Sequence, residues 1–244
     1  MISNSKLIFM IISTIICFGL PIGLTVYFYK KEKISLFAVF CGALMFIVSQ
    51  VCLRIPMLQY LNKQPWFINF IKSNTVIYMV LIALSAGIFE EVARFIGIKY
   101  ILKNRLSWKN GIAFGIGHGG VEAILIVGFT YISNIIYSFF INSGNEIPYA
   151  DVLINTPSYM FLLGGLERIF AIALHMALTM VVLEGVIKKQ GKYILYAISI
   201  HALVDFVAVY NKNIFLIEGF MCLVALISLR FLIRSKSKIK SLSF

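Results

Sequence analysis

The sequence predicts an all-α membrane protein, a polytopic bundle of about seven transmembrane helices with one further helix at the membrane surface. Three observations support this prediction. Hydrophobic residues make up 60% of the 244-residue chain and charged residues only 13%, whereas soluble domains carry about 25% charged residues. Apolar runs of about 20 residues, long enough to cross a bilayer, recur along the chain. Basic residues fall between these runs, as in membrane proteins.

The candidate spans follow one another with short linkers. The first follows Lys6 and is too long for a signal sequence, so we expect it to be retained. The third, fourth and fifth exceed the length needed and are expected to tilt, kink or extend beyond the bilayer. The mixed segment Arg54–Asn74 predicts an interfacial helix or lid. The seven runs are Leu7–Tyr29, Ile34–Leu53, Thr75–Leu102, Gly111–Ile141, Ser158–Ile187, Tyr193–Tyr210 and Ile214–Ile233.

Basic residues are much more abundant in alternate linkers, after the first, third, fifth and seventh runs. Positive linkers stay in the cytoplasm, so we expect the N-terminus outside and the C-terminus inside. We predict one bundle domain over residues 1–233, with its motif-bearing core at about 75–210, and a disordered basic cytoplasmic tail at 234–244. The net charge of +12 is spread over these linkers, which argues against a nucleic-acid partner and for the lipid bilayer.

Other patterns exclude some classes of site. The four cysteines are far apart and form no CxxC pair, which excludes a zinc-finger signature and a disulfide framework. No internal repeat is visible, which weighs against an inverted-repeat transporter.

Ionisable residues are concentrated where a membrane protein tolerates them least. All three histidines and seven of the ten acidic residues lie inside the apolar runs. Each such group costs roughly 2.5–3.5 kcal/mol on insertion scales, so it must face a partner or a wet cavity. Four runs carry an acid and a basic partner at helical spacing. These pairs are Glu90 with Arg94, His118 with Glu122, Glu167 with His175, and His201 with Asp205.

These residue types support hydrolysis. Two adjacent carboxylates, Glu90 and Glu91, cannot easily both ionise in a low dielectric, which leaves one able to take a proton from water. Arg94 can hold the other through a two-pronged hydrogen bond. A histidine can orient the water or stabilise an oxyanion, or histidines and carboxylates can bind a metal such as zinc.

Structural alternatives exist for each group. Glu90, Glu91 and Arg94 could form a buried ion pair that locks two helices, and Arg168 could simply neutralise Glu167. The glycines around His118 either permit close helix packing or let a substrate backbone approach. They are Gly115, Gly117, Gly119 and Gly120.

Three motifs together resemble a known group of intramembrane endopeptidases. Glu-Glu-x-x-Arg (Glu90–Arg94), Phe-x-x-x-His (Phe114–His118) and His-x-x-x-Asp (His201–Asp205) follow the order of the CAAX-protease and bacteriocin-processing superfamily. The stretch Gly117–Ala123, and Glu167-Arg168 before His175, resemble the YhfC-type branch of bacterial membrane peptidases. The resemblance covers roughly Gly87 to Asp205 and implies a bacterial cell membrane.

The resemblance implies roles for several residues. Glu90 and Glu91 would activate the attacking water, with Arg94 supporting them. His118 corresponds to the second motif, and His201 with Asp205 to the last motif, which stabilises the oxyanion. His175-x-x-x-Thr179 is a rival for the last motif.

Two departures from the superfamily pattern keep a metal-dependent mechanism open. Only two residues separate the glutamate pair from Arg94, with Phe95 at the usual arginine position. Asp205 replaces the usual asparagine, and an aspartate is the better metal ligand. We therefore also consider a metal site, with zinc as the candidate ion, in which Glu167 supports the ligands. Its candidate ligands are His118, His175 and His201, with Glu122 or Asp205.

The sequence thus predicts a membrane-embedded peptidase that cleaves a membrane-associated protein or peptide. Counted along the predicted helices, its site should lie in the cytoplasmic half of the membrane. A proton-coupled transporter is the main alternative, because buried Glu, Asp and His also form proton relays. A non-catalytic peptide-binding or immunity protein is the third.

Overall fold

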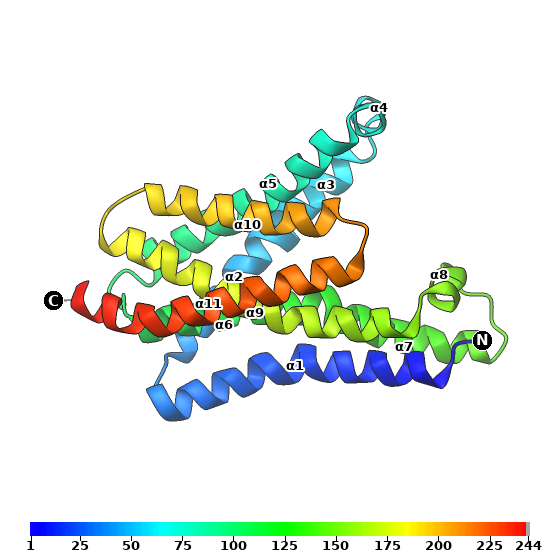
Figure 1. Cartoon of the computed structure of the whole chain (residues 1–244), viewed down its shortest axis with the longest axis horizontal. Helices are drawn as coiled ribbons and strands as arrows, with labels where there is room; N and C mark the ends of the chain where they lie inside the picture. Colours follow the sequence, from blue (N-terminus) through cyan, green and yellow to red (C-terminus); the bar gives the residue numbers. More distant parts are fainter. Residues whose placement is uncertain (243–244) are drawn as a thin grey trace.

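A computed structural model describes residues 1–242 of the chain, with the side chains of residues 1–239. In this part the secondary structure is entirely helical, and seven helices are long and apolar enough to cross a membrane. They lie roughly side by side, with the N- and C-termini at opposite ends (Figure 1). The all-α seven-span prediction is confirmed.

Several spans are joined from consecutive helical segments, three of which are π-helical. The second span combines α2, η1 and α3, the third α5 and η2, and the fourth α6, η3 and α7. The helices are α1 (Asn4–Glu32), α2 (Leu36–Phe46), η1 (Ile47–Arg54), α3 (Ile55–Leu61), α4 (Pro65–Ser73), α5 (Thr75–Ile96), η2 (Gly97–Ile101), α6 (Trp108–Glu122), η3 (Ala123–Gly128), α7 (Phe129–Asn142), α8 (Ala150–Asn155), α9 (Ser158–Ile187), α10 (Lys192–Tyr210) and α11 (Ile214–Leu242). π-Segments inside α-helices often mark functional sites.

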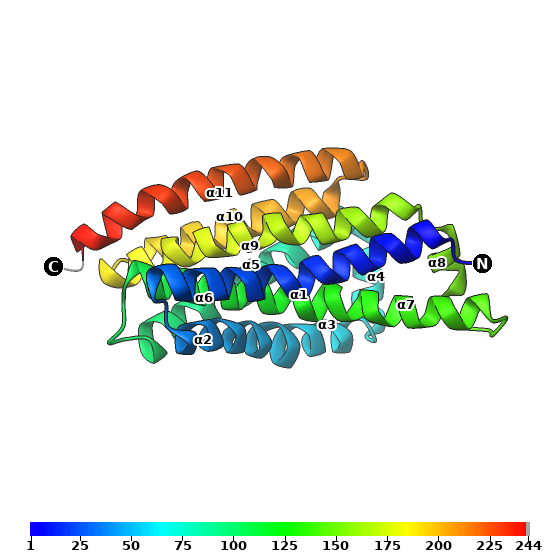
Figure 2. The same ribbon diagram turned by 90° about the horizontal axis from the view of Figure 1, so that it is seen from below.

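Helix α9 is the centre of the bundle. Within its most apolar window, 78% of the residues are buried, against 11–39% for the other spans. It packs against α1, α5, α6, α10 and α11, and Figure 2 shows it between α1 and α10. Helices around it expose large aliphatic and aromatic side chains outward, as expected for surfaces that face lipid.

Glycines let α6 approach three neighbours at once. A Cβ atom at Gly117 would overlap the carbonyl oxygen of Val39 in α2. A Cβ at Gly119 would lie 3.0 Å from Cβ of His175 in α9, and one at Gly120 would lie 2.6 Å from Cβ of Pro21 in α1. The packing interpretation of these glycines is therefore correct, because they face protein rather than open space.

Two predicted segments differ in the structure. Residues 54–74 do not form one interfacial helix: the first part continues the second span as α3, and α4 follows as a separate short helix. The tail after residue 233 is not disordered up to Leu242, because α11 continues through it without a break. Two basic side chains of the tail contact the bundle, since Lys236 pairs with Glu32 at 2.5 Å and Lys238 pairs with Glu184 at 2.8 Å. Residues 243–244 lie outside the described part of the chain.

Candidate metal centre

Glu90 of α5 is the residue on which the buried polar groups converge. Its Oε2 lies 3.1 Å from Nε2 of His118 in α6. The same oxygen lies 3.9 Å from Nδ1 of His175 in α9 and 3.9 Å from Nε2 of His201 in α10. All four residues are buried. The structure thus brings the three histidines of the chain, each from a different helix, around one carboxylate oxygen.

The neighbouring Glu91 has a different environment. Successive residues of a helix point about 100° apart, so the two carboxylates face different partners. Oε1 of Glu91 lies 2.8 Å from Nδ1 of His201 and 3.3 Å from Nη2 of Arg94. Glu91 is fully buried, and it does not line the cavity beside Glu90. This carboxylate orients His201 rather than facing a substrate.

Arg94 fixes His175 as well as Glu91. Its Nη1 donates to the carbonyl oxygen of His175 at 2.8 Å, and its Nη2 lies 2.9 Å from Nδ1 of that residue. A guanidinium can only donate, so Nδ1 of His175 is the acceptor. The predicted two-pronged bond to a glutamate is absent among these contacts, because the two Nη groups are shared between Glu91, His175 and Thr179.

Glu122 pairs across helices rather than along its own helix. Its Oε2 lies 2.6 Å from Nε2 of His175, and its Oε1 accepts a hydrogen bond of 2.8 Å from Nη1 of Arg168. Arg168 also contacts Glu167. The predicted pairs of His118 with Glu122 and of Glu167 with His175 are therefore wrong, since His118 turns to Glu90. The predicted neutralisation of Glu167 by Arg168 is found.

Asp205 stands at the margin of the site. Its Oδ2 lies 3.6 Å from Nε2 of His201, and its side chain is 34% exposed. Within residues 1–239, no side chain donates a hydrogen bond to it. Asp205 lines a cavity of about 90 Å³ together with Glu90, His175 and His201. This cavity is large enough for a few water molecules.

Gln50 is a site residue that the motif analysis missed. Its Nε2 donates to Oε1 of Glu90 at 2.7 Å, and its Oε1 accepts a hydrogen bond of 3.1 Å from Arg54. Arg54 in turn donates to Oγ of Ser85 at 3.0 Å. The signal was present in the sequence, because Gln50 and Arg54 are polar residues four apart in the second span.

The side chains suit a bound metal ion. One ligand atom from each of Glu90, His175 and His201 lies within 4.8 Å of the other two. Zinc bonds of about 2.0–2.2 Å in tetrahedral geometry place ligand atoms roughly 3.3–3.6 Å apart, so shifts of under about 1 Å would close the site. Each of these histidines also bonds a carboxylate through its other nitrogen, the usual support for metal-binding histidines. A cation on Nδ1 of His175 would displace the hydrogen bond from Arg94.

This trio differs from the set expected from sequence. The three potential ligands are Glu90, His175 and His201. His118 is not one of them and contacts Glu90. Glu122 contacts the other ring nitrogen of His175. From the sequence, Glu90 was predicted only to act as a general base. Spacing along one helix cannot show which residues of neighbouring helices Glu90 faces.

Comparison with known families agrees with this site. Residues 16–228 match the family model described as YhfC intramembrane metalloprotease. The chain belongs to the YhfC family. It is 36% identical over 254 residues to a protein of Bacillus subtilis (strain 168) described as uncharacterized membrane protein YhfC. That alignment covers 97% of this chain and 98% of the relative. No solved structure matches the chain.

In this YhfC protein the residues of the candidate metal site lie farther from the helix ends than predicted. His118 is ten residues from the start of α6, and His201 nine from the start of α10, or about 15 and 14 Å along the helix axes. Half of a hydrocarbon core of about 30 Å is a similar depth. These distances exceed the predicted ones because α6 and α10 begin before the predicted starts, and the placement in the cytoplasmic half of the membrane stays a prediction.

Proposed function

We propose that this protein is a membrane-embedded peptidase that hydrolyses a peptide bond of a membrane-associated protein or peptide. The observation that carries the proposal is the convergence of His118, His175 and His201 on Oε2 of Glu90. Burying three imidazoles and several carboxylates among lipid-facing helices is expensive, and such groups usually serve function. The name of the family supports a metal-dependent protease.

Glu90, His175 and His201 are the proposed ligands, and Zn²⁺ is the proposed ion, because imidazole and carboxylate are common zinc ligands. A bound zinc ion would polarise the scissile carbonyl and lower the proton affinity of a water molecule. Glu91 and Glu122 hold the two imidazoles in the tautomers that leave one nitrogen for the ion. His118 and Gln50 hold Glu90 from its two sides.

Asp205 is the proposed general base. A base must reach the attacking water, and Asp205 lines the cavity with its side chain partly exposed. Both oxygens of Glu90 already have hydrogen-bond partners, and Glu122 is held in ion pairs with Arg168 and His175. Glu91 is enclosed by His201 and Arg94. This assignment moves the base from the glutamate pair to Asp205 and leaves the pair to position the site.

The orientation is also a proposal. Lys and Arg are abundant at one end of the bundle, in the connections α1–α2, η2–α6 and α9–α10. The positive-inside rule places this end in the cytoplasm. The N-terminus then lies outside a bacterial cell membrane. The cavity is lined by Glu167 and Ala208 as well as by His175 and His201, and Glu167 and Ala208 lie on its outer side.

Purified protein in liposomes tests the peptidase proposal. We expect it to cleave co-reconstituted membrane peptides, with products visible by mass spectrometry, and we expect Glu90→Gln to abolish cleavage. Glu146→Gln, in the α7–α8 loop, is the matched control. Intact peptides together with a pH-dependent solute flux would instead identify a transporter. Intact peptides that stay bound would identify a non-catalytic peptide-binding protein.

A further inference from the structure

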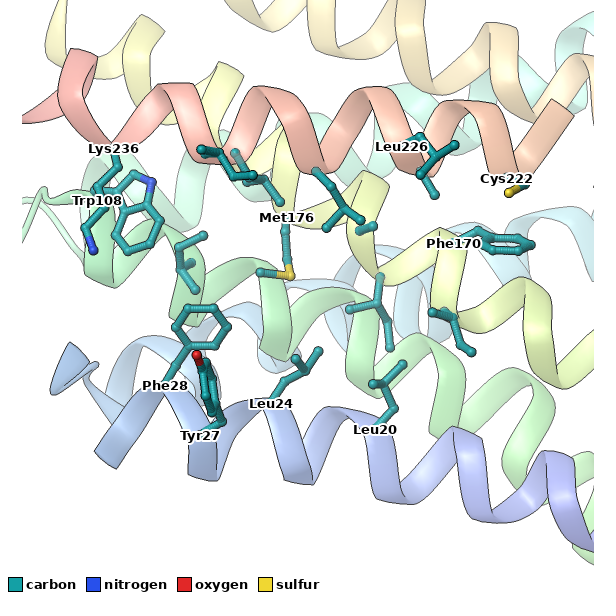
Figure 3. Close-up of a pocket in the computed structure, with 18 residues that line it drawn as sticks. Leu20, Leu24, Tyr27, Phe28, Trp108, Phe170, Met176, Cys222, Leu226 and Lys236 are labelled. Atoms are coloured by element: carbon teal, nitrogen blue, oxygen red, sulfur yellow. The ribbon is translucent and has the colours of Figure 1, made fainter. Parts of the chain in front are cut away.

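A long apolar groove lies on the opposite side of α9 from the polar cavity. Helices α1, α6, α9 and α11 enclose about 690 Å³ there. Figure 3 shows Leu20, Leu24 and Phe28 of α1 facing Leu226 of α11 across Met176. His175, the residue before Met176, lines the polar cavity instead. The groove is therefore separate from the metal centre.

The length of the groove matches one leaflet of a bilayer. Along α11 it runs from Cys222 to Lys236, which is roughly 21 Å at 1.5 Å per residue. Half of a bilayer with its headgroup region is about 20–22 Å thick. The groove thus extends from the C-terminal membrane surface to about the middle of the bilayer, where Phe170 and Cys222 line its inner end (Figure 3).

The surface end of the groove is basic and aromatic. Nζ of Lys236 lies 4.8 Å from the ring centroid of Trp108 and 2.5 Å from Oε1 of Glu32. Lys31 donates a hydrogen bond of 2.7 Å to the hydroxyl of Tyr27, which also lines the groove. Lys109 follows Trp108 in the chain. Three lysines against one carboxylate give this end a net positive charge.

We propose that the groove binds an acyl chain of an anionic phospholipid, with its phosphate held at Lys236. The apolar walls accept the chain, and the lysines complement the headgroup. The basic surface end favours an anionic lipid over a helix of a second copy, because this chain carries a net charge of +12. This lipid site is independent of the proposed peptidase activity.

Tryptophan fluorescence gives a direct test. The chain has two tryptophans, Trp66 and Trp108, so Trp66→Phe leaves the groove residue as the only reporter. The protein is reconstituted in phosphatidylcholine vesicles that contain increasing fractions of brominated phosphatidylglycerol. We expect Trp108 to be quenched at a low fraction of this lipid, and unbrominated phosphatidylglycerol to reverse the quenching. Brominated phosphatidylcholine at the same fractions should quench much less.

Two variants identify the site. Lys236→Gln should weaken the preference for phosphatidylglycerol by about fivefold, the effect of one basic residue at an anionic surface. Lys63→Gln, an exposed lysine before α4, is the matched control and should change nothing. Ala225→Phe should fill the groove and abolish the reversible quenching. The proposal would be overturned if the two brominated lipids quenched Trp108 equally, or if Lys236→Gln kept the wild-type preference for phosphatidylglycerol. It would also be overturned if the wild-type protein formed a dimer that Ala225→Phe dissociates.

Discussion

Nδ1 of His201 donates a hydrogen bond of 2.8 Å to Oε1 of Glu91, joining α10 to α5 inside the bundle. The carboxylate must accept, so a proton sits on Nδ1, and Nε2 is the nitrogen left to face the cavity. Nε2 is the nitrogen that faces Glu90 and Asp205. One buried hydrogen bond thus aims His201 at the cavity. A histidine oriented in this way is prepared to bind a metal ion.

This relationship predicts the effect of replacing Glu91. Glu91→Gln keeps the shape of the side chain but removes the charge that holds His201 and Arg94. Loss of such a supporting carboxylate typically weakens metal binding by about 10–100-fold. Competition with a zinc chelator measures the affinity. Glu184→Gln is the control, because Glu184 bonds Lys188 at the far end of α9, and equal affinities in the two variants would contradict the role of Glu91.

Asp205 is predicted to act in catalysis and not in holding the ion. Removing a general base typically slows a reaction by about 10²–10⁴-fold. Asp205→Asn should therefore lose cleavage of a membrane peptide that the wild type cleaves, while it retains zinc. Mass spectrometry of the peptide and elemental analysis of the same sample give both readouts. Retained cleavage, or loss of the zinc, would refute this assignment.

Arg168 is predicted to be important for stability. Its side chain is only 11% exposed and bridges Glu122 and Glu167. Removing one partner of a buried pair costs about 3–5 kcal/mol, because the other charge is left without compensation. Arg168→Gln should lower the free energy of unfolding by about this amount, measured by denaturant titration in detergent. Arg230→Gln, at an exposed position of α11, should have little effect.

The prediction for Gly117 tests the packing of α6. Gly117→Ala would push a methyl group into the backbone of Val39, and overpacking costs about 1–3 kcal/mol or more. Gly23→Ala is the matched control, since nothing lies within 4 Å of its added methyl group. The control should be neutral or slightly stabilising, because Ala favours helix by about 1 kcal/mol. Comparable melting temperatures would show that α6 and α2 do not pack this closely.

Much of the fold followed from the sequence because hydrophobic length is a strong signal. The fifth span was predicted with its observed bounds, Ser158–Ile187. The ends of other helices were predicted less closely, since polar residues such as Lys192 and Lys109 still fit into the terminal turns. The tail was predicted to be disordered from its Lys and Ser content, but Lys236 and Glu32 fix it against α1.

Most of the polar residues that meet in the structure were candidates from the sequence, but Gln50 was missed and the contacts between them were not predictable. Buried His and Glu residues marked the four helices that meet, because an ionisable side chain in an apolar run must face a partner or a wet cavity. Spacing along one helix then suggested partners such as His118 and Glu122. The actual partners come from neighbouring helices, as His118 with Glu90 shows. Such contacts depend on the rotation of each helix, which the pattern of one span does not determine.

Elemental analysis of four purified proteins is the sharpest test of the metal centre. We predict close to one zinc per chain in the wild type, loss of zinc in His201→Ala and in Glu90→Gln, and retention in His118→Ala. The distinction follows because His118 lies outside the trio of ligand atoms. Wild-type protein without zinc after growth in zinc-supplemented medium, or zinc that persists in His201→Ala, would contradict the proposed site.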